Sequence, residues 1–241
     1  MSDAGQQRDV GVVIVAGGSS TRTGAGQTNE LKQFRWVAGK PVLLHSLQTF
    51  MTRPDVVSVV VVLPRDYVPD PPPWIFQCDV DRLMLAPGGA TRTQSVRNGL
   101  EDLPDEAAIV LVHDAARPLV DDATIDRVVR AVRDAGDADR GVVAALPVVD
   151  TLKAVDAEGR VTHTVPRESL WRAQTPQGFS RALIERAHRD AKASGVDATD
   201  DAGLCERIGV PVVVVRGSER AMKITEEADF ARVEALFGLA Q

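Results

Sequence analysis

The chain has 241 residues, of which 44% are hydrophobic, 26% charged and 4% aromatic. This balance is typical of an ordinary globular protein, and the length suits one domain that spans residues 1–241. The net charge of −6 argues against a broad nucleic-acid-binding surface, which requires clustered positive charge. We therefore expect no nucleic-acid partner, although a few local cations and a metal ion would suffice to bind a nucleotide.

Three further absences narrow the class of protein. No apolar run reaches the roughly 18 residues that a membrane-spanning helix needs. The two cysteines, Cys78 and Cys205, form no CxxC pair, which argues against a disulfide framework or a zinc site. The first ten residues lack the layout of a signal peptide. These observations predict a cytoplasmic protein that does not contact a membrane.

Strands and helices are predicted to alternate along the chain. Short, Val-rich runs are typical of strands buried on both faces, and they lie at Val10–Ala16, Val56–Leu63, Leu83–Ala86, Ala108–His113, Gly141–Pro147 and Val210–Val215. Amphipathic segments between and after them predict helices at Pro41–Met51, Thr93–Leu103, Ala123–Ala135, Arg181–Ala193 and Glu226–Phe237. This order predicts an α/β fold with a mostly parallel sheet and helices on both of its faces.

One polar segment breaks the alternation. Residues Asp150–Val165 form two extended runs around a turn that ends at Gly159, which predicts a β-hairpin arm at about residues 148–168. An isolated hairpin is only marginally stable in water, so we expect it to pack against another element or a second subunit.

The first strand leads into a loop of small residues that extends from Ala16 to Arg22. Small side chains let backbone N–H groups approach phosphates, although such a loop can also be a simple tight turn. Two cations follow, Arg22 and Lys32, and they would suit a triphosphate whose charge shifts during the reaction. The alternative for either cation is a solvated position on the surface.

Two more loops follow predicted strands. Asp114 lies just after the fourth strand, where a carboxylate can hold Mg²⁺ together with substrate phosphates, or can cap a turn. Gly88 and Gly89 follow the third strand and would allow a base or ribose close to the backbone, or would form a simple strand-to-helix turn. Arg117 could belong to the site or to a structural ion pair.

Taken together, these residues resemble the 2-C-methyl-D-erythritol 4-phosphate cytidylyltransferase family. The matching motifs occur in family order over nearly the whole chain: Ala16-Gly17-Gly18 through Arg22, Lys32-Gln33-Phe34, Gly88-Gly89 with Arg92 and Ser95, His113 through Pro118, Asp150 through Lys153, Thr175 through Phe179, Thr199-Asp200-Asp201 and Met222 through Thr225. The resemblance implies a Rossmann-like nucleotidyltransferase fold, a divalent cation such as Mg²⁺, and a homodimer joined through the hairpin arm. Its substrates would be CTP and a sugar-alcohol phosphate, and pyrophosphate would be released.

The resemblance also implies roles for individual residues. The catalytic cations would be Arg22, Lys32 and Lys223, and the nucleotide would be bound by Ala16, Gly17, Gly18, Gly88, Ser95 and Ala115. Asp114 would hold the metal and contact the acceptor. The remaining acceptor-binding residues would be Thr151, Arg167, Thr175 and Lys223, the first two supplied by a partner subunit.

The chain departs from the family pattern at Gly17, Ser20 and Leu31, and its loop between Arg22 and Lys32 is longer than in the best-known members. Other functions therefore stay open. They are a ribitol-5-phosphate cytidylyltransferase, a sugar-phosphate nucleotidyltransferase that uses another nucleotide, and a catalytically silent nucleotide-binding regulatory domain. A dinucleotide-dependent oxidoreductase is disfavoured because its glycine fingerprint is missing after the first strand.

Overall fold

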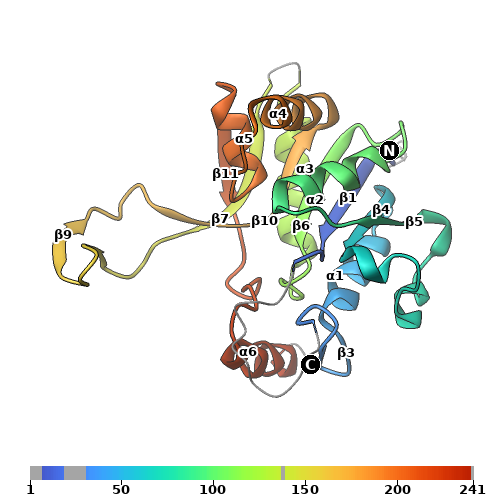
Figure 1. Ribbon diagram of the computed structural model, residues 1–241, viewed down its shortest axis with the longest axis horizontal. Helices are drawn as coiled ribbons and strands as arrows, with labels where there is room; N and C mark the ends of the chain where they lie inside the picture. Colours follow the sequence, from blue (N-terminus) through green and yellow to red (C-terminus); the bar gives the residue numbers. More distant parts are fainter. Residues whose placement is uncertain (1–6, 19–30, 137–138, 240–241) are drawn as a thin grey trace, which may run out of the picture.

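A seven-stranded sheet forms the centre of the computed structural model, which describes residues 7–18, 31–136 and 139–239 (Figure 1). Its strand order is β11-β7-β10-β6-β1-β4-β5. These strands are β1 (Val10–Val15), β4 (Val56–Leu63), β5 (Leu83–Pro87), β6 (Ile109–Asp114), β7 (Gly141–Pro147), β10 (Trp171–Ser180) and β11 (Val212–Arg216). Two short antiparallel pairs lie outside this sheet, β2 (Trp36–Val37) with β3 (Lys40–Pro41), and β8 (Leu152–Val155) with β9 (Val161–Val165).

Helices cover both faces of the sheet, as predicted. Those with ten or more residues are α1 (Val42–Met51), α2 (Arg92–Glu101), α3 (Asp122–Arg133), α4 (Arg181–Ser194) and α6 (Glu227–Gly238), and a shorter one is α5 (Asp201–Arg207). Short turns of 3₁₀ helix also occur in the described ranges, η1 (Arg65–Tyr67), η2 (Pro73–Phe76) and η3 (Val80–Arg82). Among the described residues, no helix combines the length and apolar character needed to cross a membrane.

Alternate side chains of the buried strands build two cores. Val12 and Ile14 of β1 face α1 and α3, whereas Val13 faces the opposite core with α2, α4 and α5. This two-sided burial explains the nearly continuous apolar runs of the central strands, because neither face of these strands is left to solvent. The first turns of α2 and α3 are capped by the side chains of Thr91 and Asp121.

The prediction missed β10 and α5. β10 lies between β7 and β6 and is antiparallel to both, so the sheet is mixed rather than uniformly parallel. Its sequence, with Gln174, Pro176 and Gly178, lacks the Val-rich pattern of the other strands. Gly178 is required by packing, since a Cβ there would lie 2.5 Å from Val128 Cγ1 of α3. The packing that defines this strand is therefore non-local.

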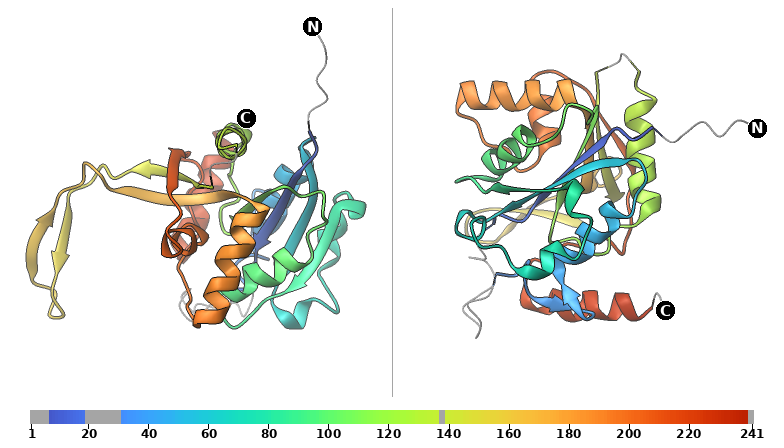
Figure 2. Two further views of the ribbon diagram at one scale, coloured as in Figure 1. Left: turned by 90° about the horizontal axis from the view of Figure 1, so that it is seen from above. Right: turned by 90° about the vertical axis from the view of Figure 1, so that its right-hand side faces the viewer.

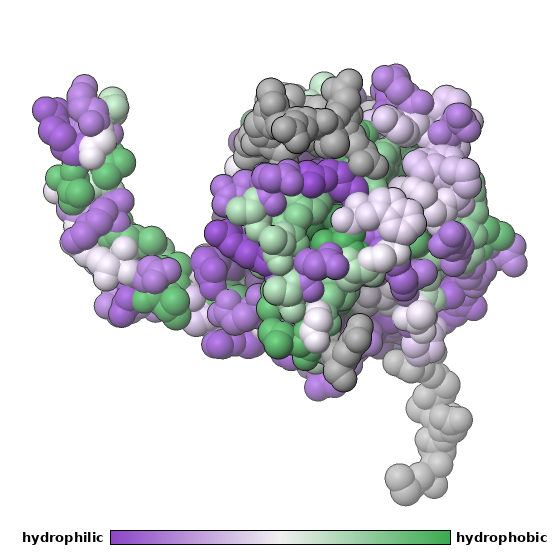
Figure 3. All heavy atoms as spheres, turned by 90° about the horizontal axis from the view of Figure 1, so that it is seen from below, coloured by the Kyte–Doolittle hydropathy of each residue, from purple (hydrophilic) through white to green (hydrophobic). Residues whose placement is uncertain are grey.

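The hairpin prediction is confirmed: β8 and β9 pair around a turn in which Gly159 adopts a positive φ of 79°. Figures 1 and 2 show this arm projecting from the body of the molecule, attached through the ends of β7 and β10. Its surface carries apolar side chains between polar ones (Figure 3), and Val155 and Val161 are 58% and 60% exposed. The arm has no hydrophobic core of its own.

Candidate functional site

The site lies where β1 and β6 end next to each other. The two strands are parallel, and Val15 is paired with Asp114, so the residues that follow them emerge side by side. The Ala115 N–H donates to the Val15 carbonyl at 3.1 Å, and the Ala16 N–H donates to the Val62 carbonyl of β4 at 2.9 Å. The carboxyl ends of the parallel strands thus form one edge, the usual position of a ligand site in an open α/β sheet.

Asp114 stands at this edge among three cationic side chains. Lys223 donates from Nζ to Asp114 Oδ2 at 2.7 Å. Arg92 Nε lies 3.6 Å from Oδ1, and Arg117 Nε lies 4.0 Å from Oδ2. The sequence separation between Lys223 and Asp114 shows that only the fold brings these charges together.

The cations determine the protonation state of Asp114. Burial disfavours its charged form, but Lys223, Arg92 and Arg117 outweigh burial and hold the pKa of this carboxyl well below its ordinary value. Asp114 is therefore an ionised acceptor at neutral pH. An ionised carboxylate beside cationic groups can orient a phosphate ligand or share a cation with one.

A buried acidic residue, Asp201, holds the Arg92 side chain in position. Arg92 donates from Nη1 to Asp201 Oδ2 at 2.7 Å, and Asp201 Oδ1 lies 3.0 Å from His188 Nε2. Asp201 is fully buried, and the charge of Arg92 helps to hold its pKa below the ordinary value against the effect of burial. Gln177 completes the arrangement by accepting hydrogen bonds from the backbone N–H groups of Asp201 and Ala202. The Thr199-Asp200-Asp201 motif therefore supports Arg92, which faces Asp114.

Thr175 approaches Asp114 from β10. Its hydroxyl accepts from the Asp114 backbone N–H at 3.0 Å and lies 3.0 Å from His113 Nδ1. His113 is fully buried, and burial lowers its pKa to about 4, so its ring is neutral at physiological pH. In this arrangement Thr175 orients the backbone at Asp114, and its peptide bond to Pro176 is cis.

Lys32 lies beside the same segment as Lys223. Its Nζ donates to the Ile224 carbonyl at 3.2 Å, across 192 positions of sequence. The neighbouring Gln33 is buried and donates from Nε2 to the Ala16 carbonyl at 2.6 Å and to the Gly18 carbonyl at 3.4 Å. This residue connects the loop after β1 to the segment that carries Lys32.

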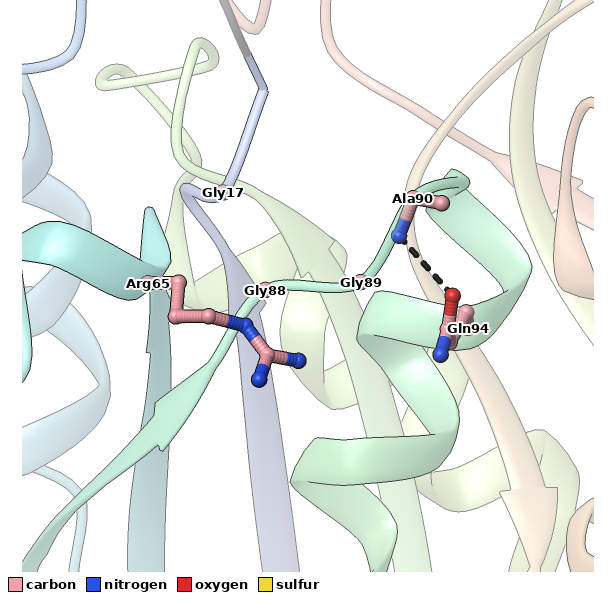
Figure 4. Close-up of a pocket in the computed structure, with 6 residues that line it drawn as sticks. All are labelled: Gly17, Arg65, Gly88, Gly89, Ala90 and Gln94. Atoms are coloured by element: carbon pink, nitrogen blue, oxygen red, sulfur yellow. Dashed lines mark hydrogen bonds between the residues drawn. The ribbon is translucent and has the colours of Figure 1, made fainter.

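A pocket of about 380 Å³ opens beside this edge (Figure 4). It is lined by Gly17, Arg65, Gly88, Gly89, Ala90 and Gln94. Gly17 and Gly88 approach each other so closely that a Cβ on Gly17 would lie 3.2 Å from the Gly88 Cα. Glycine at these two positions keeps the floor of the pocket open to a flat ligand.

Ser95 shapes the loop above this floor. Its hydroxyl accepts from the Gly89 N–H at 3.0 Å and donates to the Thr91 carbonyl at 2.9 Å. The buried Ser95 thus fixes the conformation of the loop between β5 and α2. The same loop leads to Arg92, so the glycine-lined pocket and Asp114 are joined through the first turn of α2.

The structure brings most of the predicted residues together. Around the edge formed by β1, β4, β5 and β6 lie Ala16, Gly17, Gly18, Lys32, Gly88, Ser95, Asp114, Ala115, Thr175 and Lys223. Arg22 lies outside the described residues. Thr151 and Arg167 lie on the projecting arm, where Arg167 donates to the Val149 carbonyl. None of the hydrogen bonds and ion pairs in the described part of the chain joins these two residues to Asp114.

Sequence reasoning missed several residues of this region. Arg65, Gln94 and Gln33 received no role, and Asp201 was only part of a motif. No sequence pattern distinguished Arg65, because a single arginine after an apolar strand is usually just a solvated surface residue. Within the described ranges, no group of three or more His, Cys, Asp or Glu side chains is placed to hold a metal ion.

Comparison with known families identifies the family of this chain. A family model for 2-C-methyl-D-erythritol 4-phosphate cytidylyltransferase matches residues 10–238. The chain belongs to this family. Among solved structures, a member of the family from Thermus thermophilus is similar with a TM-score of 0.75 and 36% identity, covering 95% of this chain and 98% of that one.

Two curated relatives differ in how much of their own length this chain covers. The 2-C-methyl-D-erythritol 4-phosphate cytidylyltransferase of Acidobacterium capsulatum is 40% identical over 225 residues, which cover 90% of this chain and 92% of the relative. The bifunctional enzyme IspD/IspF of Solidesulfovibrio magneticus is 44% identical over 224 residues, covering 91% of this chain but 55% of the relative. The chain thus spans about half the length of the bifunctional relatives that it matches.

Proposed function

We propose that this chain transfers CMP from CTP to 2-C-methyl-D-erythritol 4-phosphate and releases pyrophosphate. The observation that carries the proposal is the position of Asp114 at 2.7 Å from Lys223, beside a glycine-lined pocket and on the edge where Lys32 lies. A nucleotide needs a flat recess for its base and cations for its phosphates, and the two features lie next to each other here. Membership of the family supports the choice of CTP and of the acceptor.

The reaction in this proposal is an in-line displacement at the α-phosphorus of CTP. An oxygen of the acceptor phosphate forms the new P–O bond, and the bond to the bridging oxygen of pyrophosphate breaks. An ionised phosphate needs no general base, so the residues position the reactants and neutralise charge. Lys32 and Lys223, with Arg22, would stabilise the transferring group. Ala16, Gly17, Gly18, Gly88, Ser95 and Ala115 would line the nucleotide.

The acidic group of this site suits a divalent cation such as Mg²⁺. Mg²⁺ is commonly held by one or two carboxylates together with substrate phosphates, and Asp114 supplies one ionised carboxylate. When bound, the cation would offset charge on the phosphates and orient them. Lys223 is 41% exposed, which leaves its ammonium group room to turn from Asp114 toward a phosphate.

We also propose that the arm joins two copies of the chain. Its apolar residues Val149, Val155 and Val161 are exposed, and a two-stranded hairpin gains stability by packing on a partner. In such a homodimer, Thr151 and Arg167 of one copy would reach the acceptor phosphate in the site of the other, where Thr175 and Lys223 already lie. Both cysteines are free thiols, which supports a reducing compartment such as the cytoplasm.

The decisive experiment measures pyrophosphate release from CTP with each candidate acceptor. Release that depends on 2-C-methyl-D-erythritol 4-phosphate supports the proposal, whereas dependence on ribitol 5-phosphate would reassign the acceptor. Binding of CTP without any release would indicate a regulatory domain. Replacing CTP by ATP, GTP or UTP tests whether another nucleotide is the donor.

A further inference from the structure

His113, the last residue but one of β6, is enclosed by other side chains. It is fully buried, and its ring packs edge to face against that of Phe50 from α1, with 5.1 Å between the ring centroids. Both ring nitrogens have a polar neighbour: Nδ1 lies 3.0 Å from the Thr175 hydroxyl, and Nε2 lies 3.3 Å from the Arg117 carbonyl. The ring therefore connects β10 with the loop that follows β6.

The Arg117 carbonyl determines which nitrogen of the neutral ring carries the hydrogen. A carbonyl oxygen only accepts, so Nε2 is the N–H donor and Nδ1 has the lone pair. The Thr175 hydroxyl therefore donates to Nδ1, while its oxygen accepts from the Asp114 N–H at 3.0 Å. The hydrogen bonds run in one direction, from the Asp114 N–H through Thr175 and His113 to the Arg117 carbonyl.

This chain of hydrogen bonds joins the two ends of the turn at residues 114–117. The ends are also linked directly, because the Arg117 N–H donates to the Asp114 carbonyl at 3.0 Å. The Asp114 carboxylate faces Lys223 at 2.7 Å, and Arg117 donates from Nη1 to the Ala221 carbonyl at 2.8 Å. A shift at either end of the turn would therefore move the carboxylate relative to Lys223.

We propose that His113 is a positioning residue: its ring holds the turn at both ends and thereby keeps the Asp114 carboxylate in place for the reacting groups. The ring is buried, so it acts through Thr175 and Arg117 and not by contact with a substrate. The inference rests on the proposed function for the reaction that benefits, whereas the hydrogen bonds can be measured without any substrate.

Three substitutions separate the two links of the ring. His113→Asn places a carbonyl oxygen near the position of Nδ1 and can keep the bond from Thr175. His113→Gln places an amide N–H near the position of Nε2 and can keep the bond to Arg117. His113→Phe retains a flat ring of similar size and breaks both links. The matched control is Thr124→Val, because Thr124 is a buried polar residue of α3 whose hydroxyl accepts from Arg127.

NMR spectroscopy of the ligand-free protein tests the hydrogen bonds. Long-range proton–nitrogen correlations should show a neutral His113 ring with its hydrogen on Nε2. Amide hydrogen exchange at Asp114 and Arg117 should become roughly ten-fold faster in His113→Phe, the scale of one lost hydrogen bond. His113→Asn should restore slow exchange at Asp114, and His113→Gln should restore it at Arg117. A hydrogen on Nδ1, or exchange in His113→Phe equal to that of the parent, would overturn the inference.

Pyrophosphate release measures the effect on the reaction. His113→Phe should lower kcat by roughly ten- to one hundred-fold, the scale for a residue that orients the ligand of a metal ion. The KM for CTP should change much less, because the loops that form the glycine-lined pocket do not include the turn. His113→Asn and His113→Gln should each recover part of the loss in kcat.

Thermal unfolding distinguishes positioning from a loss of stability. If kcat of His113→Phe is no lower than that of Thr124→Val, the residue is structural only and the inference is wrong. A loss of kcat in His113→Phe that exceeds any loss in the control at a similar Tm supports it. Absence of pyrophosphate release from the parent protein would refute the proposed function alone, because the exchange measurements decide separately whether His113 holds the turn.

Discussion

The substitution Asp201→Asn tests whether the buried pair behind Asp114 supports the site. Asp201 is fully buried and contacts Arg92 at 2.7 Å and His188 at 3.0 Å. Asparagine has nearly the same shape, but it is neutral and replaces one acceptor oxygen with a donor. Arg92 would therefore lose its nearest counter-charge while 22% of its side chain is exposed.

The size of the effect follows from this burial. Removing one partner of a buried ion pair costs about 3–5 kcal/mol, and the partial exposure of Arg92 favours the lower end, about 3 kcal/mol. For a chain of this length, that corresponds to a decrease in Tm of about 6–12 °C. Because Arg92 also faces Asp114 at 3.6 Å, kcat/KM should decrease by roughly ten-fold, the equivalent of one weakened contact of about 1.4 kcal/mol.

Thermal and urea unfolding measure the stability, and pyrophosphate release measures kcat/KM. The matched control is Asp197→Asn, because Asp197 is an exposed acceptor for Thr91 near the same loop. A Tm for Asp201→Asn equal to that of the control would refute the stabilising role of the pair. A large loss of stability with unchanged kcat/KM would show that Arg92 keeps its position without Asp201.

Three further outcomes are expected, the first two from the proposed function and the third from the burial of His113. Lys32→Ala and Arg22→Ala should each lower kcat by roughly two to three orders of magnitude, the scale of one lost oxyanion donor, and near-normal turnover in both would contradict their roles. Arg167→Ala should raise the KM for the acceptor and leave that for CTP unchanged; an unaltered acceptor KM would remove Arg167 from that site. His113 has its pKa lowered from 6.5 to about 4 by burial, so the unfolded chain binds more protons at this residue between these values, and the contribution of His113 to the free energy of unfolding should fall by about 3 kcal/mol as the pH decreases from 6.5 to 4. Urea titrations of the parent and of His113→Gln at these two pH values measure this effect. The same change in unfolding free energy between the two pH values in both proteins would contradict it.

Local patterns in the sequence determined most of the secondary structure. The strands β4 and β7 have the predicted bounds, because a continuous Val-rich run buried on both faces has few alternatives. The caps of α2 and α3 are also local, since the Thr91 and Asp121 side chains accept hydrogen bonds from N–H groups three residues further along the chain. Small residues and a carboxylate after three strands likewise marked the edge where the site lies, because parallel strands bring their carboxyl ends together.

Only the tertiary structure decided which distant groups meet. β10 carries no strong strand pattern and is defined by pairing with β6 and β7. The contact of Lys223 with Asp114 and the position of Arg65 over the glycine loop depend on strand order and on loop closure over long separations. A charged side chain has no periodicity that reveals its partner, so its electrostatic environment becomes defined only when the sheet has assembled.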